Sequence, residues 1–205
     1  MKETKHIKTN SFTNTYGIVL CGGKSSRMDT DKSMLQYYDK PQRYHVFDML
    51  QPLCQKVFIS CNTEQAKNIE AGYDFIKDDE SFGNIGPMAA LLTAFTKHPE
   101  KNMLLIGCDY PFLKADGLQI FATHCKDAPA AFYNKEQKVY EPMLAWYPYS
   151  CFDKLKAMFD GQQFSLRHFL EADNAIIYLP LDMNSFKSID NKEAFAKTIK
   201  ELNAG

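Results

Sequence analysis

The sequence predicts an α/β fold in which helices cover both faces of a mostly parallel sheet, giving three layers. From residue 16 onward, short apolar runs alternate with amphipathic stretches, which is typical of strands that alternate with covering helices. The run at residues 103–106 is wholly apolar, as expected for a central parallel strand that is buried on both faces. A further apolar run at residues 17–20 leads directly into glycines and then into cations. This order is typical of a phosphate-binding loop at the edge of such a sheet.

Composition limits the class of protein. The chain has 205 residues, of which 45% are hydrophobic and 24% charged, and its formal net charge is -1. These values indicate a soluble globular protein without a general attraction to nucleic acid or to anionic membranes. We therefore expect no nucleic-acid partner and no membrane partner. The six cysteines have no metal-ligand or redox-motif spacing, which predicts reduced thiols in a cytoplasmic protein.

The expected elements follow in order. Residues 1–15 are polar and are predicted to be a flexible leader, and residues 16–205 a single domain. After the glycine turn we expect a helix from Pro41 to about residue 53, a strand at 57–60, a helix capped at Asn62 that reaches about residue 70, and a brief strand at 73–76. A helix at 88–96 follows Gly86 and Pro87, whose position at a helix start leaves amides free for an anionic group.

The second half continues the alternation. We expect the central strand from residue 103, a helix at 114–125, strands at 128–133 and 138–147 joined by a polar turn, and helices at 151–159 and 165–171. A late strand at 175–179, an extended piece at 186–190 and a helix at 192–202 complete the domain. Pro142 inside an apolar run predicts either an edge strand or a bulge.

The first loop differs from a Walker loop, since five residues rather than four separate Gly17 from the pair Gly23-Lys24. The better interpretation is a strand that ends at Leu20, followed by Gly22 and Gly23, whose bare backbone amides can approach a base and phosphates. Arg27 and Lys32 would then supply positive charge to phosphate oxygens. The alternative is a tight turn with a solvated basic loop.

Acidic residues follow two of the expected strands. Asp109 ends the central strand at the carboxyl edge of the sheet, where a single carboxylate is sufficient to hold Mg²⁺ together with substrate phosphates. The alternative role of Asp109 is to cap the turn before Pro111. Asp78 or Asp79 could accept hydrogen bonds from the N1 and N2 donors of guanine or from ribose hydroxyls, and the alternative is a solvated acidic turn.

Several segments resemble one known family. The stretch Leu-Cys-Gly-Gly-Lys-Ser-Ser-Arg-Met-x-x-Asp-Lys at residues 20–32 resembles the signature of the MobA family, the molybdenum cofactor guanylyltransferases. Segments that begin at Gly86, Glu141 and Gly161 are also similar to family segments. Asp29 stands where the family usually has glycine, and Ser60 and Ser188 stand where it has asparagines.

This resemblance implies a Rossmann-like nucleotidyltransferase fold and transfer of GMP from GTP to the terminal phosphate of molybdopterin, with release of pyrophosphate. It also implies roles for individual residues. The expected nucleotide-binding residues are Leu20, Cys21, Gly22, Gly23, Lys32, Asn62, Asp78 and Asp109. The expected catalytic residues are Arg27, Lys32 and Asp109, with Mg²⁺ on Asp109. The expected acceptor-binding residues are Gly86, Pro87, Glu141, Arg167 and Asp190, and the alternative role of Arg167 is to pair with a surface carboxylate.

Alternative functions remain open at this point. A related enzyme could transfer CMP from CTP to the same acceptor or activate a sugar phosphate. Related cytidylyl enzymes tend to have Leu-Ala-Ala-Gly where this chain has Leu-Cys-Gly-Gly, so Gly22 favours guanine over cytosine as the base. A non-catalytic nucleotide-binding adaptor could keep the same fold. Expected partners besides GTP and molybdopterin are cofactor-delivery or molybdoenzyme-chaperone proteins.

Overall fold

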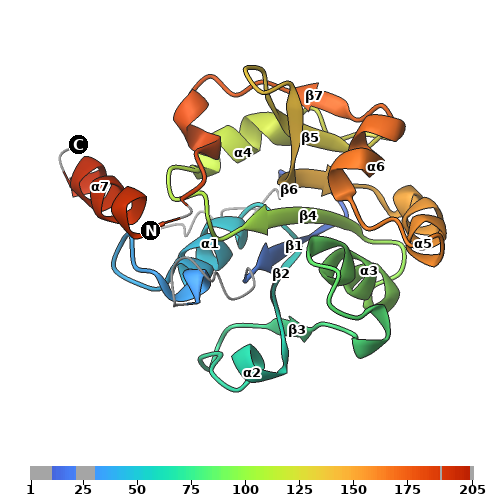
Figure 1. The fold of residues 1–205 in the computed structure, drawn as a ribbon, viewed down its shortest axis with the longest axis horizontal. Helices are drawn as coiled ribbons and strands as arrows, with labels where there is room; N and C mark the ends of the chain where they lie inside the picture. Colours follow the sequence, from blue (N-terminus) through green and yellow to red (C-terminus); the bar gives the residue numbers. More distant parts are fainter. Residues whose placement is uncertain (1–10, 22–30, 190, 204–205) are drawn as a thin grey trace, which may run out of the picture.

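The computed structural model describes residues 11–21, 31–189 and 191–203 and contains a seven-stranded sheet with the strand order β3-β2-β1-β4-β6-β5-β7 (Figure 1). The strands are β1 Thr15–Leu20, β2 Lys56–Cys61, β3 Phe75–Lys77, β4 Asn102–Gly107, β5 Ala130–Asn134, β6 Val139–Tyr147 and β7 Ile176–Tyr178. Strand β6 is antiparallel to β4 and β5, and every other pairing in the sheet is parallel. The mostly parallel sheet is therefore confirmed.

Helices cover both faces of this sheet. They are α1 Gln42–Leu50, α2 Thr63–Ala66, α3 Pro87–Lys97, α4 Ala115–Ala122, α5 Phe152–Asp160, α6 Leu166–Ala172 and α7 Lys192–Asn203, with short 3-10 turns η1 Lys32–Met34, η2 Glu80–Phe82, η3 Tyr149–Cys151 and η4 Met183–Phe186. Helices α1 and α4 pack on one face, and α3, α5 and α6 pack on the other. This gives the three-layer arrangement that the sequence predicts. Within the described ranges, no helix is long and apolar enough to cross a membrane.

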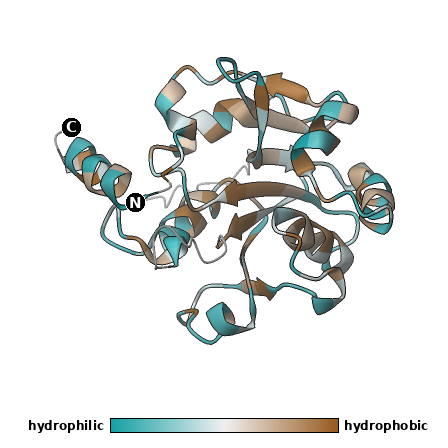
Figure 2. Ribbon diagram, viewed as in Figure 1, coloured by the Kyte–Doolittle hydropathy of each residue, from teal (hydrophilic) through white to brown (hydrophobic). Residues whose placement is uncertain are grey.

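The central strands are apolar because each of their faces meets a helical layer. In β1, Val19 belongs to the core cluster under α1 and α4, whereas Ile18 and Leu20 belong to the cluster under α3. Residues 103–106 of β4 have no exposed surface and alternate between the same two clusters. Figure 2 shows this hydrophobic centre, with hydrophilic colours concentrated on the outer helices and loops. Parallel strands buried in this way align their carboxyl ends along one edge of the sheet.

Three predicted elements differ from the structure. Helix α2 ends at Ala66 rather than near residue 70. Residues 186–190 were expected to be extended, but Phe186 closes the turn η4, and the N–H of Lys187 donates back to Asn184 of that turn. Ser188 and Ile189 then bond to Asp109, directly after β4, instead of to a strand. Strand β6 lies inside the sheet, so the edge-strand alternative for Pro142 is wrong. The bulge alternative fits, because the β5–β6 register shifts between Ala131 and Tyr133.

The expected leader is too long at its carboxyl end. Phe12 is only 2% exposed, its ring packs edge-on against Phe121 with 6.1 Å between ring centroids, and its N–H donates to the Leu53 carbonyl at 3.1 Å. Thr15 already begins β1. Residues 11–15 are thus part of the fold because one aromatic side chain fills the core between α1 and α4. Residues 1–10 lie outside the described part of the chain, and the single domain stays a prediction.

Candidate functional site

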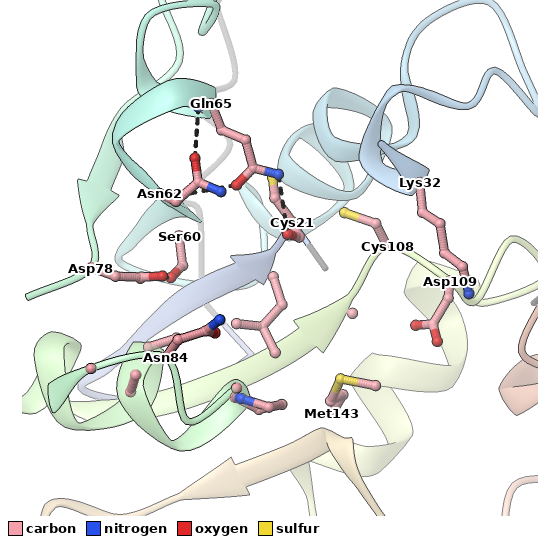
Figure 3. A pocket seen from close by; sticks show the side chains of 17 residues that line it. Cys21, Lys32, Ser60, Asn62, Gln65, Asp78, Asn84, Cys108, Asp109 and Met143 are labelled. Atoms are coloured by element: carbon pink, nitrogen blue, oxygen red, sulfur yellow. Dashed lines mark hydrogen bonds between the residues drawn. The ribbon is translucent and has the colours of Figure 1, made fainter. Parts of the chain in front are cut away.

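The carboxyl ends of β1, β2 and β4 open into a cavity of about 510 Å³, here called the strand-end pocket (Figure 3). Its wall is completed by the segment after β3 and by the start of α3. The lining residues include Leu20, Cys21, Lys32, Ser60, Asn62, Gln65, Asp78, Gly86, Pro87, Gly107, Cys108, Asp109 and Met143. Open α/β sheets bind ligands at this edge, so the pocket is where the topology predicts a ligand site.

A second cavity of about 660 Å³, here called the polar pocket, adjoins the first. It is lined by charged and amide side chains, among them Asn134, Glu136, Gln137, Glu141, Arg167, Asn184 and Lys187. Asp109 and Met143 line both pockets. The carboxylate that ends the central strand therefore lies at the boundary between two cavities, where groups bound in each could meet.

The position of Asp109 is set by residues from distant parts of the chain. Ser188 Oγ donates to Asp109 Oδ2 at 2.9 Å, and the N–H of Ile189 donates to the Asp109 carbonyl at 3.0 Å. A Cβ atom at Gly107 would lie 2.6 Å from Asp109 Oδ1, so the carboxylate occupies space that only glycine leaves free. Figure 3 shows the side chain of Lys32 extending toward Asp109 from across the pocket. The structure thus brings together the two described residues that were expected to be catalytic.

The donor set at this boundary fits a hard divalent cation. Among the described residues no group of three or more His, Cys, Asp or Glu side chains could hold a metal. Mg²⁺ does not need such a group, since it is usually bound by one or two carboxylates together with substrate phosphates and waters. Asp109 provides one such carboxylate at the boundary of both pockets, so the described residues are compatible with a phosphate-bound Mg²⁺.

The structure distinguishes between the two acidic residues after β3. Asp78 lines the strand-end pocket and accepts a hydrogen bond of 2.6 Å from Ser60 Oγ. Burial raises the pKa of Asp78, while the Ser60 hydrogen bond and the charge of Lys97 act in the opposite direction. Asp79 instead caps η2 by accepting from the N–H of Ser81 at 2.9 Å. Asp78 is therefore the carboxylate available to a ligand in the pocket.

The two polar residues at the end of β2 have different roles. The Ser60 hydroxyl is engaged with Asp78 and so orients that carboxylate. Asn62 caps α2, with its Oδ1 accepting from the N–H of Gln65 at 2.9 Å, and it also lines the strand-end pocket. The sequence indicated Asn62 as the nucleotide contact, with Ser60 standing where the family has asparagine. A contact from Asn62 stays a prediction, and it would use the side-chain amide NH₂ because the oxygen already serves the cap.

The expected acceptor-binding residues are divided between the pockets. Gly86, with φ of 70°, and Pro87 line the strand-end pocket at the start of α3, and their contact with the acceptor stays a prediction. Glu141 and Arg167 do share the polar pocket. Burial raises the pKa of Glu141, and the Arg167 charge and a 3.4 Å hydrogen bond from Tyr110 partly oppose this shift.

Other expected residues lie outside the described part of the chain. These are Gly22, Gly23, Arg27 and Asp190, together with the unexplained Asp29. Their roles stay predictions.

Sequence reasoning also missed several residues that the structure brings to the site. Gln65 lines the strand-end pocket and Met143 lines both pockets, and Ser188, noted only as a departure from the family pattern, contacts Asp109. Gln65 had a detectable signal, because Asn62 and Gln65 are spaced as a capping box. Ser188 lies 79 residues beyond Asp109 in the sequence, and no local pattern indicates that the two residues meet.

Comparison with known proteins identifies the family. The model of the MobA-like NTP transferase domain matches residues 17–176, which include the strand-end pocket and most of the polar pocket. The chain belongs to the MobA-like NTP transferase family. The resemblance seen in the sequence is thereby confirmed.

Individual MobA-like relatives give more detail. A molybdenum cofactor guanylyltransferase of Shewanella woodyi is 29% identical over 146 residues, which is 70% of this chain and 74% of that protein. A molybdenum cofactor biosynthesis bifunctional protein of Synechocystis is 33% identical over 157 residues, which is 72% of this chain. The match spans only 44% of that bifunctional protein.

A solved structure supports the fold. The molybdopterin-guanine dinucleotide biosynthesis protein A of Archaeoglobus fulgidus matches with a TM-score of 0.76 and 20% identity, covering 93% of this chain and all of that one. At this identity the match shows a shared Rossmann-like nucleotidyltransferase architecture.

Proposed function

We propose that this chain is a molybdenum cofactor guanylyltransferase, which transfers GMP from GTP to the terminal phosphate of molybdopterin and releases pyrophosphate. The observation that carries the proposal is the position of Asp109 at the boundary of two adjoining cavities. A nucleotidyltransferase needs such an arrangement, because its two substrates must meet at one phosphorus atom. The names of the relatives in Shewanella woodyi and Synechocystis support the choice of acceptor.

The proposed reaction needs no covalent intermediate with the protein. An oxygen of the acceptor phosphate attacks the α-phosphorus of GTP, a new P–O bond forms, and the bond from the α-phosphorus to the pyrophosphate oxygen breaks. Asp78 in the strand-end pocket would accept hydrogen bonds from the guanine N1 and N2 donors. Lys32 would stabilise the negative charge of the departing pyrophosphate, together with Arg27.

Asp109 would hold Mg²⁺ in this scheme, and Ser188 would keep its carboxylate oriented. Bound Mg²⁺ would neutralise phosphate charge during the transfer. Arg167 and Glu141 line the polar pocket and would contact the acceptor. Delivery or chaperone partners and a cytoplasmic location stay predictions.

The nucleotide choice can be tested directly. Purified protein is incubated with molybdopterin, Mg²⁺ and each of the four NTPs, and the products are identified by mass and by pyrophosphate release. We expect a guanine dinucleotide from GTP. A cytidine product would show that the chain is instead a cytidylyltransferase, and absence of any product would favour the adaptor.

The role of Asp109 gives a second test. Asp109→Ala is expected to lower the rate of GMP transfer by about 10²–10³-fold or more, since both metal and substrate phosphate lose their shared ligand. The measurement is the rate of pyrophosphate release at saturating Mg²⁺. Circular dichroism should show that the variant is folded. Undiminished Mg²⁺-dependent activity would contradict the assignment.

A further inference from the structure

Gln65 makes hydrogen bonds on both sides of residues 22–30. Its Nε2 donates to Asp31 Oδ2 at 2.8 Å. The same Nε2 donates to the Cys21 carbonyl at 3.4 Å, and Oε1 accepts from the N–H of Asn62 at 3.2 Å (Figure 3). Cys21 follows β1 and Asp31 immediately precedes η1, so these two residues flank residues 22–30 in the sequence. One side chain from α2 therefore links two points that are ten residues apart in the sequence.

Asp31 also makes hydrogen bonds within η1. Its second oxygen, Oδ1, accepts from the N–H of Ser33 at 2.9 Å and from Ser33 Oγ at 2.7 Å. Ser33 is fully buried, so the first turn of η1 is fixed at its base. Lys32 is the first residue of that turn and lines the strand-end pocket. We call Gln65, Asp31 and Ser33 the Gln65 network.

We propose that the Gln65 network is a positioning device that sets Lys32 over the nucleotide phosphates. A flexible lysine that must meet a moving phosphate loses less entropy on binding when its backbone is already fixed. The amide of Gln65 suits this role, because its NH₂ can donate to the Asp31 carboxylate and to a carbonyl at the same time. This inference rests on the proposed nucleotidyl transfer.

The variant Gln65→Glu separates the network from the helix cap. A glutamate keeps an oxygen that can accept from Asn62, so the capping box at α2 can persist. It replaces the donor to Asp31 with a carboxylate, and two carboxylates at this distance repel each other. Adding Asp31→Asn restores an N–H between the two side chains while keeping an oxygen for Ser33. Glu64→Gln is the matched control, since it alters an exposed carboxylate of the same helix that pairs with Lys67.

The first measurement is binding of GTP and of GMP in the presence of Mg²⁺, which does not depend on any acceptor. Gln65→Glu should weaken GTP binding by roughly 10- to 100-fold and GMP binding far less, because Lys32 acts on the outer phosphates. The combination with Asp31→Asn should recover most of the loss, and Glu64→Gln should stay within about twofold. Equal losses for GTP and GMP would overturn the proposal.

The second measurement is a double-mutant cycle with Lys32→Ala. If the network acts through Lys32, Gln65→Glu should weaken GTP binding by no more than about twofold when Lys32 is already absent. A role of Gln65 in folding alone, or its own contact with the base, would give the full loss in both backgrounds and would overturn the inference. If the wild-type protein binds GTP but transfers no GMP, the proposed function fails while this cycle still decides the role of Gln65.

Discussion

At the scale of single residues, the site depends on residues that position the ligand-binding side chains as well as on those side chains themselves. Gly107 precedes Asp109 by two residues, and the Asp109 carboxylate folds back over it. Ser60 similarly acts through Asp78 rather than on a ligand directly. Substitutions at such positions test the geometry of the site without removing a charged group.

Gly107→Ala is predicted to displace the Asp109 carboxylate, because the new Cβ would lie 2.6 Å from Oδ1 and 3.2 Å from the ring of Tyr110. We expect GMP transfer to fall by about 10- to 100-fold, as a misplacement of about 1 Å at a reacting centre can cause. The Mg²⁺ concentration needed for half-maximal rate should rise. Gly117→Ala in α4 is the control, since no atom lies within 4 Å of its Cβ and activity should be unchanged. Equal activity of both variants would contradict this account.

Asp78→Asn is predicted to stabilise the fold while weakening GTP binding. Burial raises the pKa of Asp78 above its ordinary value of 3.8, so the folded protein holds the proton more tightly than the unfolded chain. The contribution of this group to stability is thus fully present below pH 3.8 and is lost as pH rises through the raised pKa. The increase in the free energy of unfolding that Asp78→Asn causes, measured by urea unfolding, should be largest near pH 7 and should shrink toward pH 4. A gain that is independent of pH would show that ionisation of Asp78 is not its cause.

At the scale of elements, the sequence predicts what is local. The apolar run at 103–106 and the acidic residue after it locate β4 and Asp109, because burial on both faces and strand-end chemistry leave local patterns. Contacts between distant elements leave no such pattern. The docking of residues 188 and 189 on Asp109 depends on how the chain is packed, so it could not be predicted.

The ends of three neighbouring strands place Cys21, Cys61 and Cys108 on one face of the sheet. Burial raises the pKa of Cys61 to about 12. The pKa of Cys108 is also raised, first by a hydrogen bond with Cys21 and to a smaller extent by burial. At pH 8, the thiolate fraction of a cysteine with a pKa near 12 is on the order of 10³-fold smaller than that of a cysteine with an ordinary pKa. We therefore expect very slow labelling of Cys61 and Cys108 by a thiol reagent, measured by peptide mass, and rapid labelling of all six cysteines in urea. Rapid labelling of Cys61 in the native protein would contradict this burial.

At the scale of the whole molecule, the strand-end pocket is built on the strands that the two core clusters share. Its walls come from the ends of β1, β2 and β4, whose residues belong to both clusters, and from α3, whose residues belong to one of them. The polar pocket instead adds residues near β5, β6, α6 and η4. Asp109 connects the two halves, because β4 pairs with β1 on one side and with β6 on the other.

GTP with Mg²⁺ should consequently stabilise the whole fold in a single unfolding transition. A ligand at about 100 times its Kd stabilises the folded state by about 2.7 kcal/mol, which for a domain of this size corresponds to roughly 5–11 °C in Tm. The shift is measured by calorimetry at several GTP concentrations, with and without Mg²⁺. Asp109→Ala should lose the part of the shift that depends on Mg²⁺ and keep the rest, because the pocket around Asp78 is unchanged. If GTP instead moved only one of two separate transitions, the strands on either side of β4 would unfold independently, and the single domain would be wrong.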